Sequence, residues 1–187
     1  TKQFEFRNWL ITMNSEKSVQ SIINTNELFP LVNLLEDETL SETDIKEGDK
    51  FLSACENGDT EHVKKCLDVF NTSVLNKIDT GRYDYSGLHW ACDKKNIDIV
   101  KVLTSHPSIN LYVKSNTENS ALFYCIDNED VARVLLESGK LNIPEMKGVT
   151  NFAKNEDESF QFNCSSFGIN YLIQMNSNTS LKSITSA

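Results

Sequence analysis

The stretch that decides the fold is Tyr85-Ser86-Gly87-Leu88-His89-Trp90-Ala91-Cys92, which continues from Asp93 to Leu103. Read in order, it predicts a turn, a short helix that begins after a hydroxyl residue, a polar loop and a second amphipathic helix. Related patterns stand on both sides of it. A helical pair that recurs in this way buries its apolar face by stacking on its copies, so the sequence predicts an array of repeats.

The copy before this stretch lies 37 residues earlier, where Ala54 and Cys55 correspond to Ala91 and Cys92. Its two helices are separated by Asn57-Gly58-Asp59, which is strong turn chemistry. Glycine readily adopts a positive φ, and aspartate can cap the helix that follows. The first copy therefore predicts the same two-helix unit.

The copy after this stretch begins at Ser120, 34 residues after Ser86, and its second helix is expected to end at Gly139 in a left-handed cap. A weaker fourth copy is predicted further on. Its first helix would begin in Gly148-Val149-Thr150-Asn151-Phe152-Ala153, and its second would be Phe167 to Ile173.

A turn, a Leu-His-x-Ala helix, a short loop and a second apolar helix at this period resemble the ankyrin repeat. The quoted stretch keeps Leu88, His89 and Ala91 but has Gly87 where that family usually has proline. The resemblance covers about residues 48–175. It implies an all-α fold, an ankyrin-like α-solenoid of three to four helix-turn-helix repeats with a helical N-terminal extension.

Three parts are predicted along the chain. Residues 1–47 repeat nothing that follows and carry apolar residues such as Phe4 and Trp9 at helical spacing, so we expect a helical extension that caps one end of the array. Residues 48–175 are the repeat array. Residues 176–187 are rich in Asn, Ser and Thr and are expected to form a flexible tail.

An acidic stretch joins the extension to the repeats, from Glu36 to Asp49. Within it, Ser41 and Asp44 have the spacing of a capping box, which predicts that a helix begins there. The stretch is expected to be a solvated linker and helix entry. The alternative is a docking patch for a basic partner.

Charge and cysteine content narrow the class of partner. The 187 residues include 27 acids and 18 bases, and the net charge of -9 opposes direct binding to nucleic acid or to an anionic membrane surface. It favours a protein partner with a basic or mixed surface.

No apolar run approaches the ~18 residues that a membrane span needs, and no signal-peptide pattern opens the chain. The five cysteines are expected to be buried, reduced thiols, which predicts a cytoplasmic or nuclear location.

The first candidate for catalysis is His89 with Cys92, because residues three apart on a helix are neighbours. The resemblance argues against it, since both residues occupy packing positions of the repeat. The sequence has no phosphate-binding loop, no nucleophile elbow and no ligand cluster with metal spacing. It therefore predicts a protein without enzymatic activity, cofactor or metal.

Candidate binding residues surround the quoted stretch. The resemblance implies that Trp90 and Tyr124 face the concave groove on adjacent repeats, where exposed aromatic rings are frequent hot spots. The alternative is that either ring packs beneath a neighbouring hairpin or the terminal insertion. The hairpin before Trp90 is long and is predicted to be either a recognition finger or a tolerated insertion with a polar tip. The predicted partner-binding residues are Arg82, Tyr83, Asp84, Tyr85, Trp90, Lys94, Lys95, Glu118 and Tyr124.

These observations predict a protein–protein interaction scaffold or adaptor that binds through its hairpin tips and concave helix face. Two alternatives stay open. The chain is an accessory regulatory or targeting module of a larger enzyme, channel or transcription regulator, which a first residue of Thr1 rather than Met favours. Otherwise it is a structural spacer without a dedicated ligand.

Overall fold

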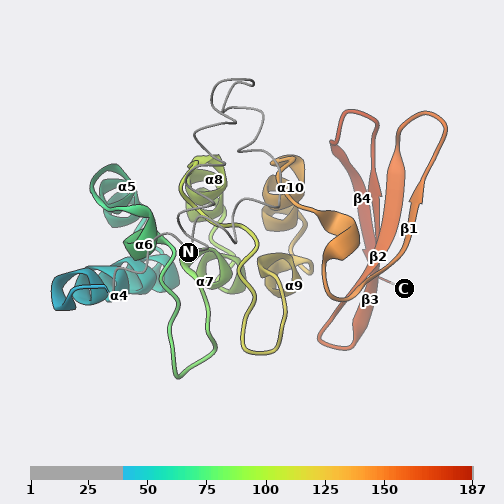
Figure 1. The fold of residues 1–187 in the computed structure, drawn as a ribbon. Coiled ribbons are helices and arrows are strands. Elements are labelled where there is room, and N and C mark those ends of the chain that lie inside the picture. The colour runs from blue at the N-terminus through green and yellow to red at the C-terminus, as the bar shows by residue number, and fades with distance from the viewer. Residues whose placement is uncertain (1–39, 187) are drawn as a thin grey trace, which may run out of the picture. The chain divides into compact units, whose positions relative to one another are not determined.

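The computed structural model describes residues 40–186, so the helical extension predicted for residues 1–47 lies mostly outside the described residues. Helices come first and strands last (Figure 1). The helices are α4 (Glu42–Asn57), α5 (Thr60–Val69), α6 (Thr72–Leu75), α7 (Gly87–Asp93), α8 (Ile97–Ser105), α9 (Ala121–Cys125) and α10 (Glu129–Glu137), followed by the 3-10 helix η1 (Ile143–Glu145). The strands are β1 (Val149–Lys154), β2 (Phe160–Ser166), β3 (Ile169–Met175) and β4 (Leu181–Ser186).

The helices pair and stack as the repeats predict. Helices α4 and α5, α7 and α8, and α9 and α10 form three pairs (Figure 1). In each pair the second helix begins with a side-chain cap, because Asp59, Asn96 and Asn128 each accept a hydrogen bond from the backbone N–H three residues later. Gly139 has a φ of 66°, which confirms the left-handed end predicted after α10.

The capping box predicted at the start of the first helix is confirmed. The backbone N–H of Asp44 donates to Ser41 Oγ at 3.1 Å, and the backbone N–H of Ser41 donates to the Asp44 carboxylate at 3.2 Å. These two bonds satisfy amide groups that a helix start would leave unpaired. Helix α4 ends at Gly58, whose φ of 82° lies in the left-handed region.

Close packing between the first two pairs explains why glycine replaces the usual proline at position 87. A Cβ atom built there would lie 2.9 Å from Cys55 Sγ and 3.0 Å from the Phe51 ring. Phe51 and Cys55 on α4 therefore occupy the space that a side chain would need. Leu88, Val100, Leu122 and Leu135 continue the buried core through the second and third pairs.

The C-terminal part is a sheet, and the all-α prediction is therefore wrong. The four strands pair antiparallel in the order β1-β2-β3-β4. They occupy the place of the predicted fourth repeat, and β4 lies where a flexible tail is expected from the sequence. The physical reason is the period of the pattern. From Phe160 to Ser165 apolar and polar residues alternate, so they fit a strand with one buried face rather than a helix.

The sheet covers the outer side of the last helical pair. Strand β2 contacts α9, and β4 contacts α10. Its inner face buries six apolar side chains, namely Phe162, Cys164, Tyr171, Ile173, Met175 and Leu181. Polar contacts fix the position, since Glu137 accepts a hydrogen bond from the Leu181 N–H at 2.8 Å and Arg133 donates to the Leu181 carbonyl at 2.9 Å.

Candidate functional site

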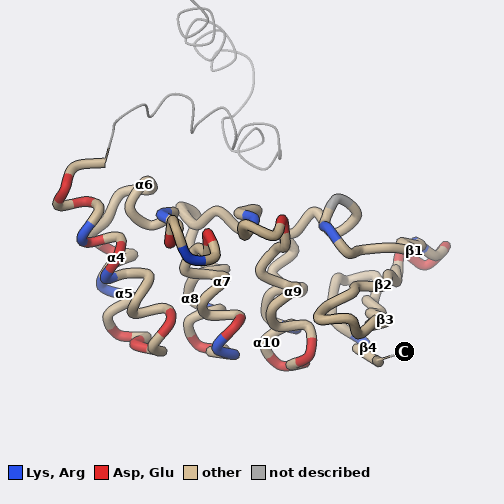
Figure 2. Tube along the Cα trace, turned by 90° about the horizontal axis from the view of Figure 1, so that it is seen from below, with Lys and Arg blue, Asp and Glu red and all other residues tan. Residues whose placement is uncertain are grey.

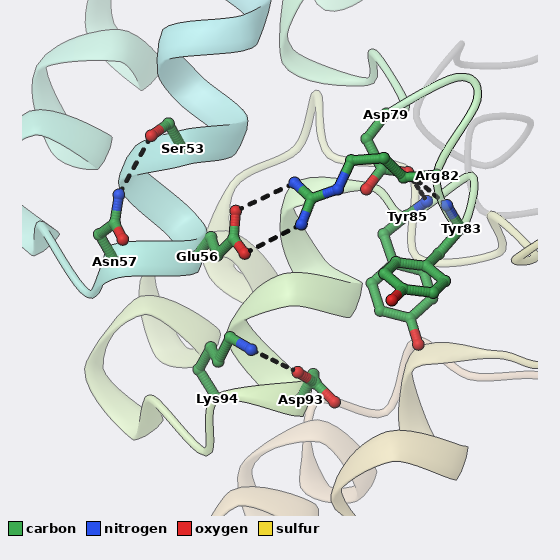
Figure 3. Close-up of polar contacts among 9 residues, drawn as sticks. All are labelled: Ser53, Glu56, Asn57, Asp79, Arg82, Tyr83, Tyr85, Asp93 and Lys94. Carbon is green, nitrogen blue, oxygen red and sulfur yellow. Dashed lines mark hydrogen bonds and ion pairs between the residues drawn. The ribbon is translucent and has the colours of Figure 1, made fainter.

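The long hairpin before α7, residues 79–85, is a closed loop, and we call it the first finger. Asp79 Oδ1 accepts hydrogen bonds from the backbone N–H of Tyr85 at 2.6 Å and of Tyr83 at 3.4 Å (Figure 3). The Asp79 N–H in turn donates to the Tyr85 carbonyl at 3.0 Å. Gly81 and Asp84 adopt positive φ angles that allow the reversal. The finger is therefore held closed by the Asp79 side chain and by its own backbone.

The next hairpin, residues 111–119, forms a second finger that holds the first. The backbone N–H of Asn116 donates to the Tyr83 carbonyl at 2.9 Å. The Asn116 side chain donates to the Arg82 carbonyl at 3.2 Å. Two bonds from one residue thus join the finger tips.

The Arg82 side chain turns back from the finger toward α4. Its two terminal nitrogens donate to the Glu56 carboxylate at 3.3 Å each (Figure 3). On the way the guanidinium lies 4.6 Å from the centre of the Trp90 ring. Lys94 Nζ lies 5.3 Å from the same ring and 3.0 Å from the Asp93 carboxylate. Both contacts are within cation–π range, and each cation also has its own carboxylate.

Trp90 is consequently only 3% exposed, and Tyr124 is also buried. Both therefore match the prediction that the rings pack beneath a neighbouring hairpin, and neither is an exposed anchor. The Tyr124 hydroxyl donates to Ser115 Oγ at 2.9 Å, which ties this ring to the second finger. The two buried rings therefore help to position the fingers.

Aromatic rings continue across the repeats as an aromatic chain. Its members are Tyr83, Tyr85, Tyr124, Phe123 and Phe167, with successive centroids 5.1, 4.7, 5.1 and 4.9 Å apart. The central rings of Tyr85 and Tyr124 are buried, whereas Tyr83 at one end is 50% exposed and Phe167 at the other is 70% exposed. The aromatic chain therefore joins the tip of the first finger to the C-terminal sheet.

The remaining predicted residues fall into two groups. Arg82, Lys94 and Glu118 are exposed, with Arg82 and Glu118 on the finger tips and Lys94 between α7 and α8. Asp84 and Lys95 are half-buried, and Lys95 donates to the Tyr124 carbonyl and to Asp127, so it links two repeats.

The sequence reasoning missed Phe123, Phe167 and Ile169, which the fold brings together at the junction of α9 and the sheet. The signal that could have revealed this site was Gly168, because a glycine between two strand-like stretches often marks a hairpin turn.

His89 and Cys92 are placed for packing. The Ser86 backbone N–H donates to His89 Nδ1 at 3.3 Å, so the ring proton is on Nε2, which donates to the Asn119 carbonyl at 3.2 Å. Burial lowers the pKa of His89 to about 4, so the ring is neutral. Burial also raises the pKa of the Cys92 thiol, which is unfavourable for a nucleophile. His89 therefore joins α7 to the second finger.

Within residues 40–186 no three His, Cys, Asp or Glu side chains gather as metal ligands would. In the same part of the chain, no helix combines the length and the apolar character of a membrane span.

The family model for ankyrin repeats, in three copies, matches residues 50–145, which is half of the chain. The chain therefore belongs to the ankyrin-repeat family, as the resemblance of its sequence predicts. Ankyrin repeats generally mediate protein–protein interaction. The comparison with curated proteins finds no match for this chain.

Proposed function

We propose that this chain is a scaffold or adaptor that binds another protein through its two finger tips and the adjoining concave face. The observation that carries the proposal is the placement of Tyr83, half exposed at the end of a finger fixed by Asp79 and Asn116. A tyrosine presented by a rigid loop contributes contact area at a small cost in conformational entropy.

Charge supports a partner with a basic or mixed surface. Acidic residues gather in and beside the short turns within the helical pairs (Figure 2). Asp59 lies in the turn between α4 and α5, with Glu56 and Glu61 on the helix ends that flank it. Asp127 lies in the turn between α9 and α10, and Glu129 and Asp130 begin α10. Acids gathered on one edge attract a basic surface and set its orientation during encounter.

The test is affinity capture with three forms of the protein: the unchanged chain, Tyr83→Ala and Phe152→Ala. Phe152 is the matched control, because it is 41% exposed but lies on β1 in the sheet. We expect the unchanged chain and Phe152→Ala to retain the same partners and Tyr83→Ala to lose them, with thermal unfolding checked for each. A folded Tyr83→Ala variant that retained every partner would contradict the proposal.

A further inference from the structure

The turn between β2 and β3 holds an aromatic residue in a conformation that disfavours it. Ser166 pairs with Ile169, so the loop consists of Phe167 and Gly168, and their φ angles are 48° and 81°. Two-residue hairpin turns with both central φ angles positive favour Asn-Gly. A bulky side chain in the left-handed region is uncommon, and such outliers concentrate at functional sites.

Burial of the Phe167 side chain does not compensate for this unfavourable backbone conformation. It remains 70% exposed although its ring lies 4.9 Å from that of Phe123. Ile169, which is 46% exposed, lies two residues before buried Tyr171 on β3 and therefore points to the inner face of the sheet. Ser166 Oγ donates to the Phe123 carbonyl at 2.5 Å and fixes the turn on α9. Phe123, Phe167 and Ile169 form what we call the junction patch.

The turn between β2 and β3, which carries Phe167, lies on the same side of the repeats as the finger tips (Figure 1). Along the aromatic chain, the ring of Tyr85 is 5.1 Å from Tyr83 and 4.7 Å from Tyr124, which is 6.3 Å from Phe167. The two exposed ends are thus no farther apart than about five residues of extended chain can reach. One short segment can therefore contact both.

Three cationic side chains on this edge already have partners within the chain. Arg82 is bound by Glu56, and Lys114 lies 3.4 Å from Glu118. Lys147 Nζ donates to the Thr117 carbonyl at 2.5 Å. A negatively charged ligand would have to compete with these contacts, whereas an uncharged segment would not. Apart from Glu56, the acidic residues described above lie in and beside the turns within the helical pairs and not on the fingers.

We propose that Tyr83 and the junction patch form one docking surface for an extended, uncharged segment of another protein. The segment carries two apolar or aromatic side chains up to about four residues apart, because alternate residues of an extended chain face the same side. The inference rests on the proposed function for the finger tip and adds the sheet to the binding surface. Phe167 is its second anchor.

The experiment is selection of a phage-displayed library of random linear peptides on the unchanged chain, followed by affinity measurement with the selected peptides. Phe167→Asn removes the ring and keeps a residue that favours this turn, so its fold is protected. We expect the selected peptides to carry paired apolar residues. We expect affinity to fall about tenfold or more for Phe167→Asn and for Tyr83→Ala, and to be kept by Phe167→Tyr and Phe152→Ala.

Four results would overturn the inference: no selected peptide, charged peptides alone, equal binding to folded Phe167→Asn, or loss with Phe167→Asn but not with Tyr83→Ala. They are distinguishable from failure of the proposed function. If Tyr83→Ala loses its protein partners while Phe167→Asn binds normally, the finger is still a binding site and only the role of the sheet is wrong.

Discussion

The helical repeats and the C-terminal sheet bury apolar surface in different ways. In α7 all six residues from Gly87 to Cys92 are buried, because α4 packs on one side and α9 on the other. The sheet buries one face, where Phe162 and Ile173 lie, and carries polar residues such as Gln161 and Gln174 on the other. A unit that is apolar on two sides extends an array, and a unit that is apolar on one side can end it. The sheet is thus the terminal cap of these repeats.

The largest expected effect comes from breaking the contact between cap and repeats. Phe162 is fully buried, and Phe162→Ala should lower the free energy of unfolding by about 3–5 kcal/mol. Urea unfolding followed by circular dichroism measures it. The matched control Phe152→Ala removes the same group from an exposed position of the sheet and should change stability by about 0.5 kcal/mol or less. Equal losses in the two variants would contradict the role of the sheet as a cap.

A smaller effect is expected inside the repeats, at the tight contact between α4 and α7. Gly87→Ala should cost about 1–3 kcal/mol, because the added Cβ meets Cys55 Sγ and the Phe51 ring. Adding Cys55→Ala frees part of this space, so the double variant should be more stable than the sum of the single effects predicts. A double-mutant cycle from urea unfolding measures the coupling. If the two changes in unfolding free energy were additive, the contact between position 87 and Cys55 would not be the cause of the loss in Gly87→Ala.

The smallest expected effect is the pH dependence that buried His89 gives to the free energy of unfolding. The pKa of His89 is lowered from 6.5 to about 4 by burial, so the unfolded chain binds a proton that the folded chain refuses. The contribution of neutral His89 to the free energy of unfolding is therefore fully present above pH 6.5 and is lost as the pH falls toward 4. The expected loss is about 1 kcal/mol between neutral pH and pH 5.5. His89→Asn should flatten this part of the profile of unfolding free energy against pH, and an unchanged slope would refute it.

The helical part could be predicted from the sequence because its signals are local. The capping box of Ser41 and Asp44 and the apolar spacing of Leu88 and Leu103 depend on residues a few positions apart. The sheet could not be predicted with the same ease. Residues 167–173 form a short apolar run that fits either a helix or a strand, and the alternation in the preceding stretch had to decide between them.

The candidate site depends on contacts that sequence spacing does not reveal. Trp90 is buried because Arg82 folds back across it toward Glu56, and no periodic pattern encodes that path. The packing of Phe167 on Phe123 joins a strand turn to a helix far from it in the chain. The sequence could therefore suggest aromatic residues for the binding site, but only the structure shows which of them are exposed.

The most direct test of the binding surface is amide hydrogen exchange of the chain, alone and with a partner recovered by affinity capture. The proposed function predicts slower exchange on binding in residues 79–85, and the further inference adds residues 165–169 of the sheet. Both proposals predict smaller changes in exchange rate for residues 127–130, around the acidic turn between α9 and α10. Protection confined to the acidic turns, with both the first finger and the β2–β3 turn unchanged, would contradict binding through the finger edge.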